Sequence, residues 1–449
     1  MIEDFMEDIS IERYPAYKVS GVELIGAIPS QWDTGRLKNL VEMITGFPFK
    51  SNKYSVSGIK LARGINVKEG VLNWDETRYW PQVENNLSDY LLAAGDILIA
   101  MDGSKVGKNF CMISDNDLPI LLLQRVARLR ARRWLFPRFL FYSIADKNFL
   151  LWVEISKTDP MVPHIAPSDI HNFIVPIPPF NEQVNIANFL DHKTALIDQA
   201  ISIKEKQIDL LKERRQLLIH RAVTRGLNPN VKMKDSGLEW IGDIPEGWTV
   251  TSVKHVLEIP ICDGPHTTPQ LYEEGYPFVS AEAIKNGEVD FGKIRGFISL
   301  KSYLEFSKKY SPKRNDIYMV KSGATTGNVA MVKTDLEFSI WSPLAVFRAN
   351  QKKVIPNYLL NYLESPSFRL SVELNWSFGT QQNIGMGILS NLPIAYPSLD
   401  EQILISEYIR RVTDKVKSAI SLKEQEIEKL KEYRASLINS AVTGKIKVC

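Results

Sequence analysis

The sequence has little of several features that mark specialised classes of protein. It contains three cysteines in 449 residues, Cys111, Cys262 and Cys449. Their odd number and wide spacing predict neither a disulfide framework nor a thiolate metal site. No apolar run approaches the roughly 20 residues of a membrane-spanning helix, and the acidic start MIEDFMEDIS does not resemble a secretory signal. We therefore expect a cytoplasmic protein with no membrane partner.

The chain also lacks a strong excess of charge of either sign. Its formal net charge is +3, so any affinity for nucleic acid must come from local basic patches rather than from bulk charge. A hydrophobic content of 44% and a charged content of 24% are ordinary for a globular protein. The length is sufficient for two or three hydrophobic cores.

What the chain does have is an internal repeat. The stretch KVSGVELIGAIPSQW from Lys18 matches KDSGLEWIGDIPEGW from Lys234 at nine of 15 positions, and GDILIAMDGSKVG from Gly95 is echoed by NDIYMVKSGATTG from Asn315. The strongest match joins residues 181–224 to residues 400–443, with 19 of 44 residues identical. The order of these segments indicates tandem duplication of a unit of about 220 residues.

Each copy combines a mixed part with one long helix. The first part contains short β-rich runs separated by Gly, Pro, Asn and Ser, whereas the second has no Pro or Gly for 44 residues. We expect an α+β protein with two pseudo-twofold-related globular α/β domains. The predicted segments are a tail (1–17), head one (18–180), helix one (181–225), a linker (226–233), head two (234–399), and helix two with a C-terminal tail (400–449).

Apolar residues recur at a spacing of three and four through both predicted helices, which favours a coiled-coil pair over two helices packed separately on their own domains. Parallel pairing in register would place Lys204 against Lys423 and Arg215 against Arg434, so we expect an antiparallel pair. The apolar seam residues are Leu190, Ile197, Ile201, Ile208, Leu211, Leu218, Ile409, Val416, Ile420, Ile427, Leu430 and Leu437.

Several short motifs in this order resemble the specificity subunit of Type I restriction–modification systems. They are PIPPFNEQ and AYPSLDEQ before the helices, KE in mid-helix, AVTRG and AVTGK at the helix ends, and GATTGN and SFGTQQNIGMGILSNLPI in head two. The resemblance implies that the heads are target recognition domains, each of which reads one half of a bipartite sequence in double-stranded DNA. It also implies that the helices fix the gap and dock methyltransferase subunits, two in number.

The same resemblance implies a non-catalytic chain. S-adenosylmethionine, ATP and Mg²⁺ would be bound by partner subunits, and restriction subunits would join through the complex. Head one departs from the pattern, because SKTDPMVPHIAPSDIHNF replaces the segment that carries Gln381 and Gln382 in head two. A shared base-reading role for that loop is therefore not implied.

The candidate DNA contacts lie in Gly-rich loops after strands and in a basic cluster. A Gly-rich loop can present backbone N–H groups and a lysine to phosphates, although a plain tight turn is the alternative. The arginines of QRVARLRARRW, at alternating positions of a strand, predict a phosphate-contacting stripe, although a solvated charged face is the commoner outcome. The candidates are Arg63, Lys105, Lys108, Arg128, Arg130, Arg132, Lys321, Thr325, Thr326, Asn328, Arg348, Gln381 and Gln382.

Two catalytic motifs are excluded by their details. DGSKVGKN has three residues between its glycines where a P-loop needs four, and Asn109 follows its lysine. IPPFN has Ile177 where the catalytic loop of an adenine methyltransferase requires Asn or Asp. The alternatives left open are an enzyme in its own right, either a methyltransferase or a nuclease, and a coiled-coil scaffold with two protein-binding heads.

Overall fold

The computed structural model describes residues 12–83, 85–157, 163–285, 287–378 and 382–448. Contacts between residues divide the chain into two compact units. Unit one combines Met1–Lys204 with Gln425–Cys449, and unit two is Glu205–Glu424. Each unit therefore holds one head, half of each long helix and, in unit one, both ends of the chain.

The core of unit one is a four-stranded antiparallel sheet in the order β4-β10-β7-β8, beside a three-stranded sheet in the order β6-β5-β9. All four residues of β7 are buried, as the apolar run ILIA predicts for a central strand. The strands are β1 (Tyr17–Val19), β2 (Ala27–Pro29), β3 (Asp33–Arg36), β4 (Val41–Thr45), β5 (Ile59–Ala62), β6 (Tyr79–Trp80), β7 (Ile97–Ala100), β8 (Phe110–Met112), β9 (Ile120–Leu122), β10 (Val126–Ala131) and β11 (Ile174–Ile177).

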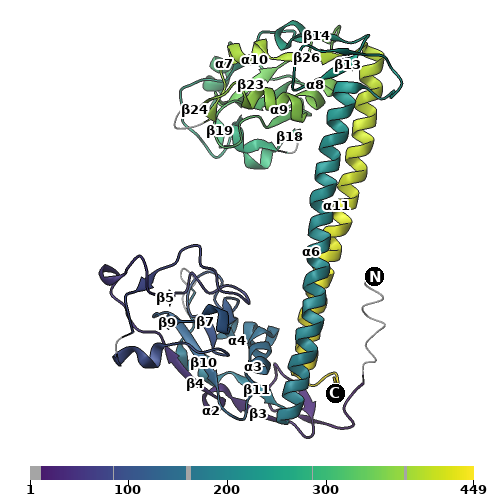
Figure 1. The fold of residues 1–449 in the computed structure, drawn as a ribbon. Coiled ribbons are helices and arrows are strands. Elements are labelled where there is room, and N and C mark those ends of the chain that lie inside the picture. Colours follow the sequence, from purple (N-terminus) through teal and green to yellow (C-terminus); the bar gives the residue numbers. More distant parts are fainter. Residues whose placement is uncertain (1–11, 84, 158–162, 286, 379–381, 449) are drawn as a thin grey trace. The chain divides into compact units, whose positions relative to one another are not determined.

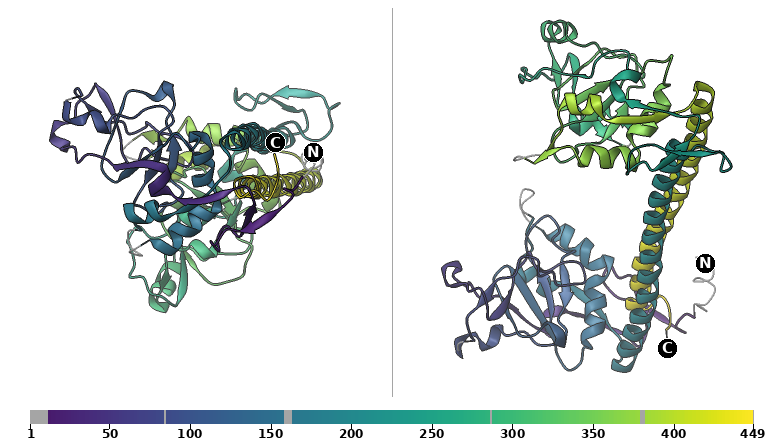
Figure 2. Two further views of the ribbon diagram at one scale, coloured as in Figure 1. Left: turned by 90° about the horizontal axis from the view of Figure 1, so that it is seen from below. Right: turned by 45° about the horizontal axis from the view of Figure 1, so that its top comes forward.

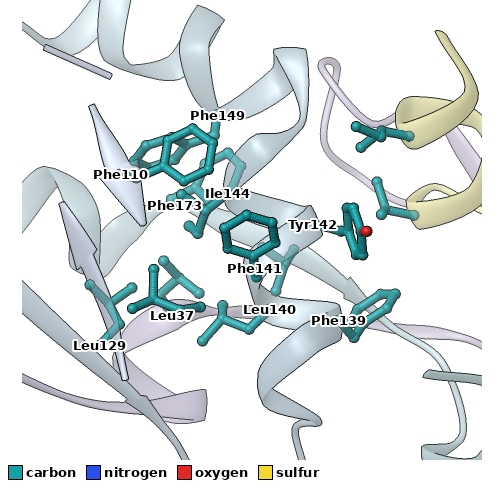
Figure 3. Packing of buried hydrophobic residues seen from close by; sticks show 14 of the residues in the cluster. Leu37, Phe110, Leu129, Phe139, Leu140, Phe141, Tyr142, Ile144, Phe149 and Phe173 are labelled. Atoms are coloured by element: carbon teal, nitrogen blue, oxygen red, sulfur yellow. The ribbon is translucent and has the colours of Figure 1, made fainter. Parts of the chain in front are cut away.

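Helices cover one side of this sheet and connect it to the long helices. They are α2 (Leu37–Leu40), α3 (Pro137–Ala145), α4 (Lys147–Ser156) and α5 (Pro167–Asn172). Proline occupies the first turn of α3 and of α5, where its missing N–H costs no hydrogen bond. Figure 3 shows the aromatic side chains of α3 and α4 in the core, with Tyr142 directed toward α11.

Unit two repeats the same core. Its main sheet has the order β15-β23-β20-β21-β18-β17, so four of its strands match the order of unit one, and β20 is again wholly buried. The strands are β12 (Met233–Asp235), β13 (Asp243–Pro245), β14 (Thr249–Ser252), β15 (Cys262–Asp263), β16 (Tyr276–Val279), β17 (Ile284–Lys285), β18 (Gly287–Val289), β19 (Phe297–Ile298), β20 (Ile317–Val320), β21 (Val329–Met331), β22 (Ser339–Ile340), β23 (Leu344–Phe347), β24 (Ser377–Phe378), β25 (Gln382–Asn383) and β26 (Pro393–Tyr396). Its short helices are α7 (Leu300–Ser307), α8 (Pro356–Leu363), α9 (Pro366–Glu373) and α10 (Met386–Asn391).

The long helices α6 (Phe180–Arg225) and α11 (Leu399–Val442) lie side by side and run antiparallel (Figures 1 and 2). In unit one the start of α6 packs against the end of α11, with Leu190 and Leu437 in one core. In unit two the end of α6 packs against the start of α11, with Val223 and Ile409 in one core. The antiparallel pair predicted from the sequence is therefore confirmed.

Charged residues in the seam explain this direction. Lys204 is buried and its Nζ lies 2.6 Å from Oε2 of Glu426, whereas a parallel register would have placed it opposite Lys423. Arg215 donates to the Thr413 hydroxyl at 3.2 Å. Of the predicted apolar seam residues, Ile201, Leu211, Leu218 and Ile420 are partly buried and the other eight are buried.

Each head is fastened to its helix by the residues of the repeated motifs. The Glu-Gln pair in the first turn of α6 does this in head one, because the Trp32 indole donates to Glu182 at 2.8 Å and the buried Gln183 amide bonds to Phe136, Trp134 and Pro178 backbone groups. In head two the Gln402 amide makes the matching three bonds, to Ile355, Lys353 and Pro397, and Trp248 donates to Glu401 at 3.3 Å. The repeated phrases are therefore a structural joint between head and helix.

Candidate nucleic-acid interface

The loop that follows the central strand has the same backbone frame in both heads. In head one Gly103 N donates to Pro163 O at 3.0 Å and Asp102 forms a β-bridge with His164. In head two Gly323 N donates to Gln382 O at 3.1 Å and Ser322 forms a β-bridge with Asn383. The two heads thus hold different side chains on one scaffold, and His164 takes the place of Asn383.

The predicted contacts in these loops differ in accessibility. Lys105, Lys108 and Thr325 are exposed, and Asn328 is partly exposed, so each remains a prediction as a DNA contact. Thr326 is buried and donates its hydroxyl to Gly323 O at 2.7 Å. Its predicted contact is wrong, because that hydroxyl closes the turn of the loop.

The segment before α10 contributes the predicted glutamines. Gln382 is partly buried, and its backbone carbonyl holds the neighbouring loop. Gln381 lies outside the described residues. Both therefore stay predictions for base contact.

The arginine stripe predicted on head one does not form as a continuous exposed surface. Arg128 is wrong as a phosphate contact, because its side chain is only 2% exposed, forms an ion pair with Glu42 and donates to Asp89 O. Arg128 lies in the part of β10 that pairs with β4 on one side and with β7 on the other. Arg132 lies just beyond β10 and is exposed, so its contact with phosphate stays a prediction.

Arg130 and Arg348 form one repeated structural feature. Arg130 donates two hydrogen bonds to the buried Asp96 at 2.7 and 2.8 Å, and Arg348 donates two to the buried Asp316 at 2.7 Å each. The hydrogen bond to the carboxylate raises the pKa of each guanidinium above its ordinary value. Because both charges are already paired, these arginines fix the turn before the central strand, and the predicted role in phosphate binding is not needed to explain their repetition.

Arg63 is likewise bound within its own head. Its backbone N–H and its Nε donate to Asn66 Oδ1 at 3.3 Å, and a terminal nitrogen donates to Glu76 O. The matching residue of head two, Ser280, is buried. This pair shows how the heads differ at one position, while a DNA contact by Arg63 stays a prediction.

A charged cluster in head two was missed by sequence reasoning, apart from Lys321. Asp263, at the end of β15, is 1% exposed, and its carboxylate lies 2.6 Å from Lys309, 3.4 Å from Lys321 and 3.2 Å from His266. These residues are separated by up to 58 positions in the chain, so no local pattern could have grouped them. Two local features of the sequence pointed to the cluster: Lys321 in its Gly-rich loop, and the position of Asp263 at the end of a strand, directly before Gly264.

Among the described residues, no group of three or more His, Cys, Asp or Glu side chains is placed to hold a metal ion. None of the helices in the described ranges is both long and apolar enough to cross a membrane.

Comparison with known proteins identifies the family. The model of the Type I restriction modification DNA specificity domain matches residues 29–213 and again residues 245–432. The chain therefore belongs to this family of DNA specificity proteins and carries the domain twice.

Individual relatives cover nearly the whole chain. The sequence is 24% identical over 431 residues to the Type I restriction enzyme EcoBI specificity subunit of Escherichia coli, covering 94% of this chain and 87% of that protein. It is 25% identical to the MjaVIII specificity subunit of Methanocaldococcus jannaschii, covering 94% of each.

Solved structures share the fold at lower identity. A chain from a structural study of the complex assembly and conformational transition of the type I R-M system superposes with a TM-score of 0.68 at 18% identity, covering 92% of this chain and 98% of that one. The HsdS subunit from Thermoanaerobacter tengcongensis gives a TM-score of 0.51 at 16% identity, covering 93% and 98%. Both support the two-headed architecture.

Proposed function

We propose that this chain is the DNA-recognition subunit of a Type I restriction–modification complex, in which each head reads one half of a bipartite target. The observation that carries this proposal is the repeated loop scaffold with different side chains. Asp102 and His164 in head one stand where Ser322 and Asn383 stand in head two. Two heads that share a frame but differ in their polar groups suit two half-sites of different sequence.

In this proposal the antiparallel helices set the gap between the two half-sites. Readers with two DNA-binding elements match half-sites whose spacing follows from protein geometry. The joint between each head and its helix uses buried hydrogen bonds from Gln183 and Gln402. Such a joint limits the movement of a head relative to the first turn of its helix, as a fixed gap requires.

Docking of two methyltransferase subunits is supported by apolar side chains that the duplication keeps exposed. Leu151 and Ile155 on α4 are 46% and 73% exposed, and their counterparts Leu370 and Leu374 are 42% and 63% exposed. Ile203 and Leu422, which occupy matched positions in the middle of the two long helices, are also exposed. Exposed apolar groups repeated at matched positions suit two copies of one protein partner.

Catalysis belongs to the partners in this proposal. Methylation with S-adenosylmethionine would occur on the methyltransferase subunits, and ATP- and Mg²⁺-dependent cleavage on restriction subunits that join through the complex. This chain would contribute the choice of sequence.

The test is to determine which sequences are bound by the chain in complex with its methyltransferase subunits, using a randomised double-stranded DNA library. A motif in two parts with a fixed gap is expected. Binding with no sequence preference would favour the scaffold alternative, and methyl transfer by the chain without partners would show that it is an enzyme.

A further inference from the structure

The charged cluster of head two, defined as Asp263, His266, Lys309 and Lys321, is built around a buried carboxylate. Burial alone would raise the pKa of Asp263, but the hydrogen bond from Lys309 and the positive charges of Lys309, Lys321 and His266 outweigh it and hold the pKa below its ordinary value. Asp263 is therefore ionised at neutral pH. An ionised, buried carboxylate fixes the direction of the ammonium groups that it binds.

The ammonium group of Lys309 is hydrogen-bonded within head two but retains one N–H donor. An ammonium group has three N–H donors, and Lys309 uses two of them, on Asp263 at 2.6 Å and on the Gly264 carbonyl at 3.2 Å. Its side chain is half exposed. Within the part of head two that the structure describes, the third N–H of Lys309 has no acceptor, so it is available in a fixed direction at the surface.

A cavity of about 170 Å³ lies beside this donor. Glu305, one helical turn before Lys309, lines it, as does Ser339, whose buried hydroxyl has no hydrogen-bond partner among the described residues. The carboxylates of Asp263 and Glu305 offset the charges of Lys309 and Lys321. A neutral ligand with both acceptors and donors suits this site better than a phosphate anion does.

We propose that this cluster reads a G·C base pair in the half-site of head two. Lys309 donates its remaining N–H to O6 or N7 of the guanine, and Glu305 accepts from the N4 amino group of the paired cytosine, both of which the major groove presents. Asp263, with Lys321 and His266 around it, acts as a positioning residue. The assignment rests on the proposed function, since it names the base pair that one head would read.

Head one does not repeat the cluster at the matching positions that the structure describes. Ala127 of β10 pairs with Thr45, and the matching Ala345 of β23 pairs with Asp263, so head one has a threonine at the position of the carboxylate. Met101 occupies the position of Lys321. Loss of the cluster should therefore affect one half of the target only.

The test compares Lys309→Met with Lys308→Met, its exposed neighbour, in the complex with methyltransferase subunits. The readout is binding to DNA variants that carry each base pair at each target position. For Lys309→Met we expect the preference for G·C at one position of one half to fall about fivefold, the lower end for a base contact. Glu305→Ala should relax the same position, and Lys308→Met should leave the motif unchanged.

Three results would contradict the assignment. An unchanged motif in Lys309→Met would show that the cluster only stabilises the fold. Equal weakening on all sequences, with the salt dependence reduced by about 0.9 in log–log slope, would show a phosphate contact instead. A wild-type complex without sequence preference would contradict the proposed function itself, and the assignment with it.

Discussion

The ion pair between Lys204 and Glu426 allows a direct test of how the long helices pair. Lys204 is 9% exposed at its side chain, Glu426 is 34% exposed, and their charged atoms lie 2.6 Å apart. Lys204→Glu would place two carboxylates together in the seam. Breaking a buried ion pair by changing one partner costs about 3–5 kcal/mol, and the partial exposure of Glu426 favours the lower end.

The assay is thermal unfolding of the single and double variants. A loss of about 3 kcal/mol lowers the midpoint by about 6–12 °C in a unit of this size. Adding Glu426→Lys to Lys204→Glu restores an ion pair with its charges exchanged, so most of the loss should be recovered. The control is Lys206→Glu, on the exposed face of the same helix, which should change the midpoint little.

Refutation would come from the pattern of rescue. If Lys204→Glu raised the midpoint and adding Lys423→Glu lowered it again, Lys204 would face Lys423 and the helices would be parallel. A midpoint unchanged in Lys204→Glu would show that this contact contributes nothing to the pairing.

The remaining predictions concern the joint, the exposed apolar pairs and one buried tyrosine. Gln183→Leu should cost about 1–3 kcal/mol for each buried group left without a partner, measured by urea unfolding. Leu151→Asp with Ile155→Asp should weaken capture of methyltransferase subunits at least tenfold in pull-down titrations, whereas Leu210→Asp, an exposed leucine that the duplication does not repeat, should not. Burial, together with the hydrogen bond to the carboxylate of α6, raises the pKa of Tyr142 to about 12. In the unfolded chain this group titrates near 10, so the folded state binds the proton more tightly and Tyr142 adds stability below pH 10 that is lost as the pH rises to 12. The stability of wild type relative to Tyr142→Phe should fall by roughly 3 kcal/mol over that range.

Each of these has a contradicting result. A Gln183→Leu protein as stable as wild type would show that the hydrogen bonds of Gln183 do not hold head one to its helix, and so do not help to fix the gap. Equal capture by the double aspartate variant would place the partner elsewhere. A difference between wild type and Tyr142→Phe that does not change from pH 9 to pH 12 would show that Tyr142 titrates normally.

The repeat made the architecture predictable from the sequence. Absence of Pro and Gly set the extent of each long helix, and the positions of Lys204 and Arg215 in the seam indicated the antiparallel direction before any contact was known. These features depend on short-range spacing, which a sequence displays directly. The roles of Gln183 and Trp32 could not be read in this way, because their partners lie 47 or more residues away or are backbone groups.

The candidate site was less predictable for a similar reason. Alternation correctly placed Arg128 and Arg130 on one face of a strand, but whether that face is covered depends on β4, β7 and the acidic residues Glu42 and Asp96. Charge in a sequence indicates a surface only where tertiary structure leaves the residue uncovered. The cluster around Asp263 is the converse case, since it is assembled from three separate segments.

The central claim, that each head independently reads one half of the target, is tested most directly by exchanging one head and sequencing the methylated sites. Residues 18–180 would be replaced by the corresponding head of another specificity subunit, and methylation would be mapped in cells that also contain the methyltransferase subunits. One half of the methylated motif should change while the other half and the gap stay the same. A change in both halves together would contradict it.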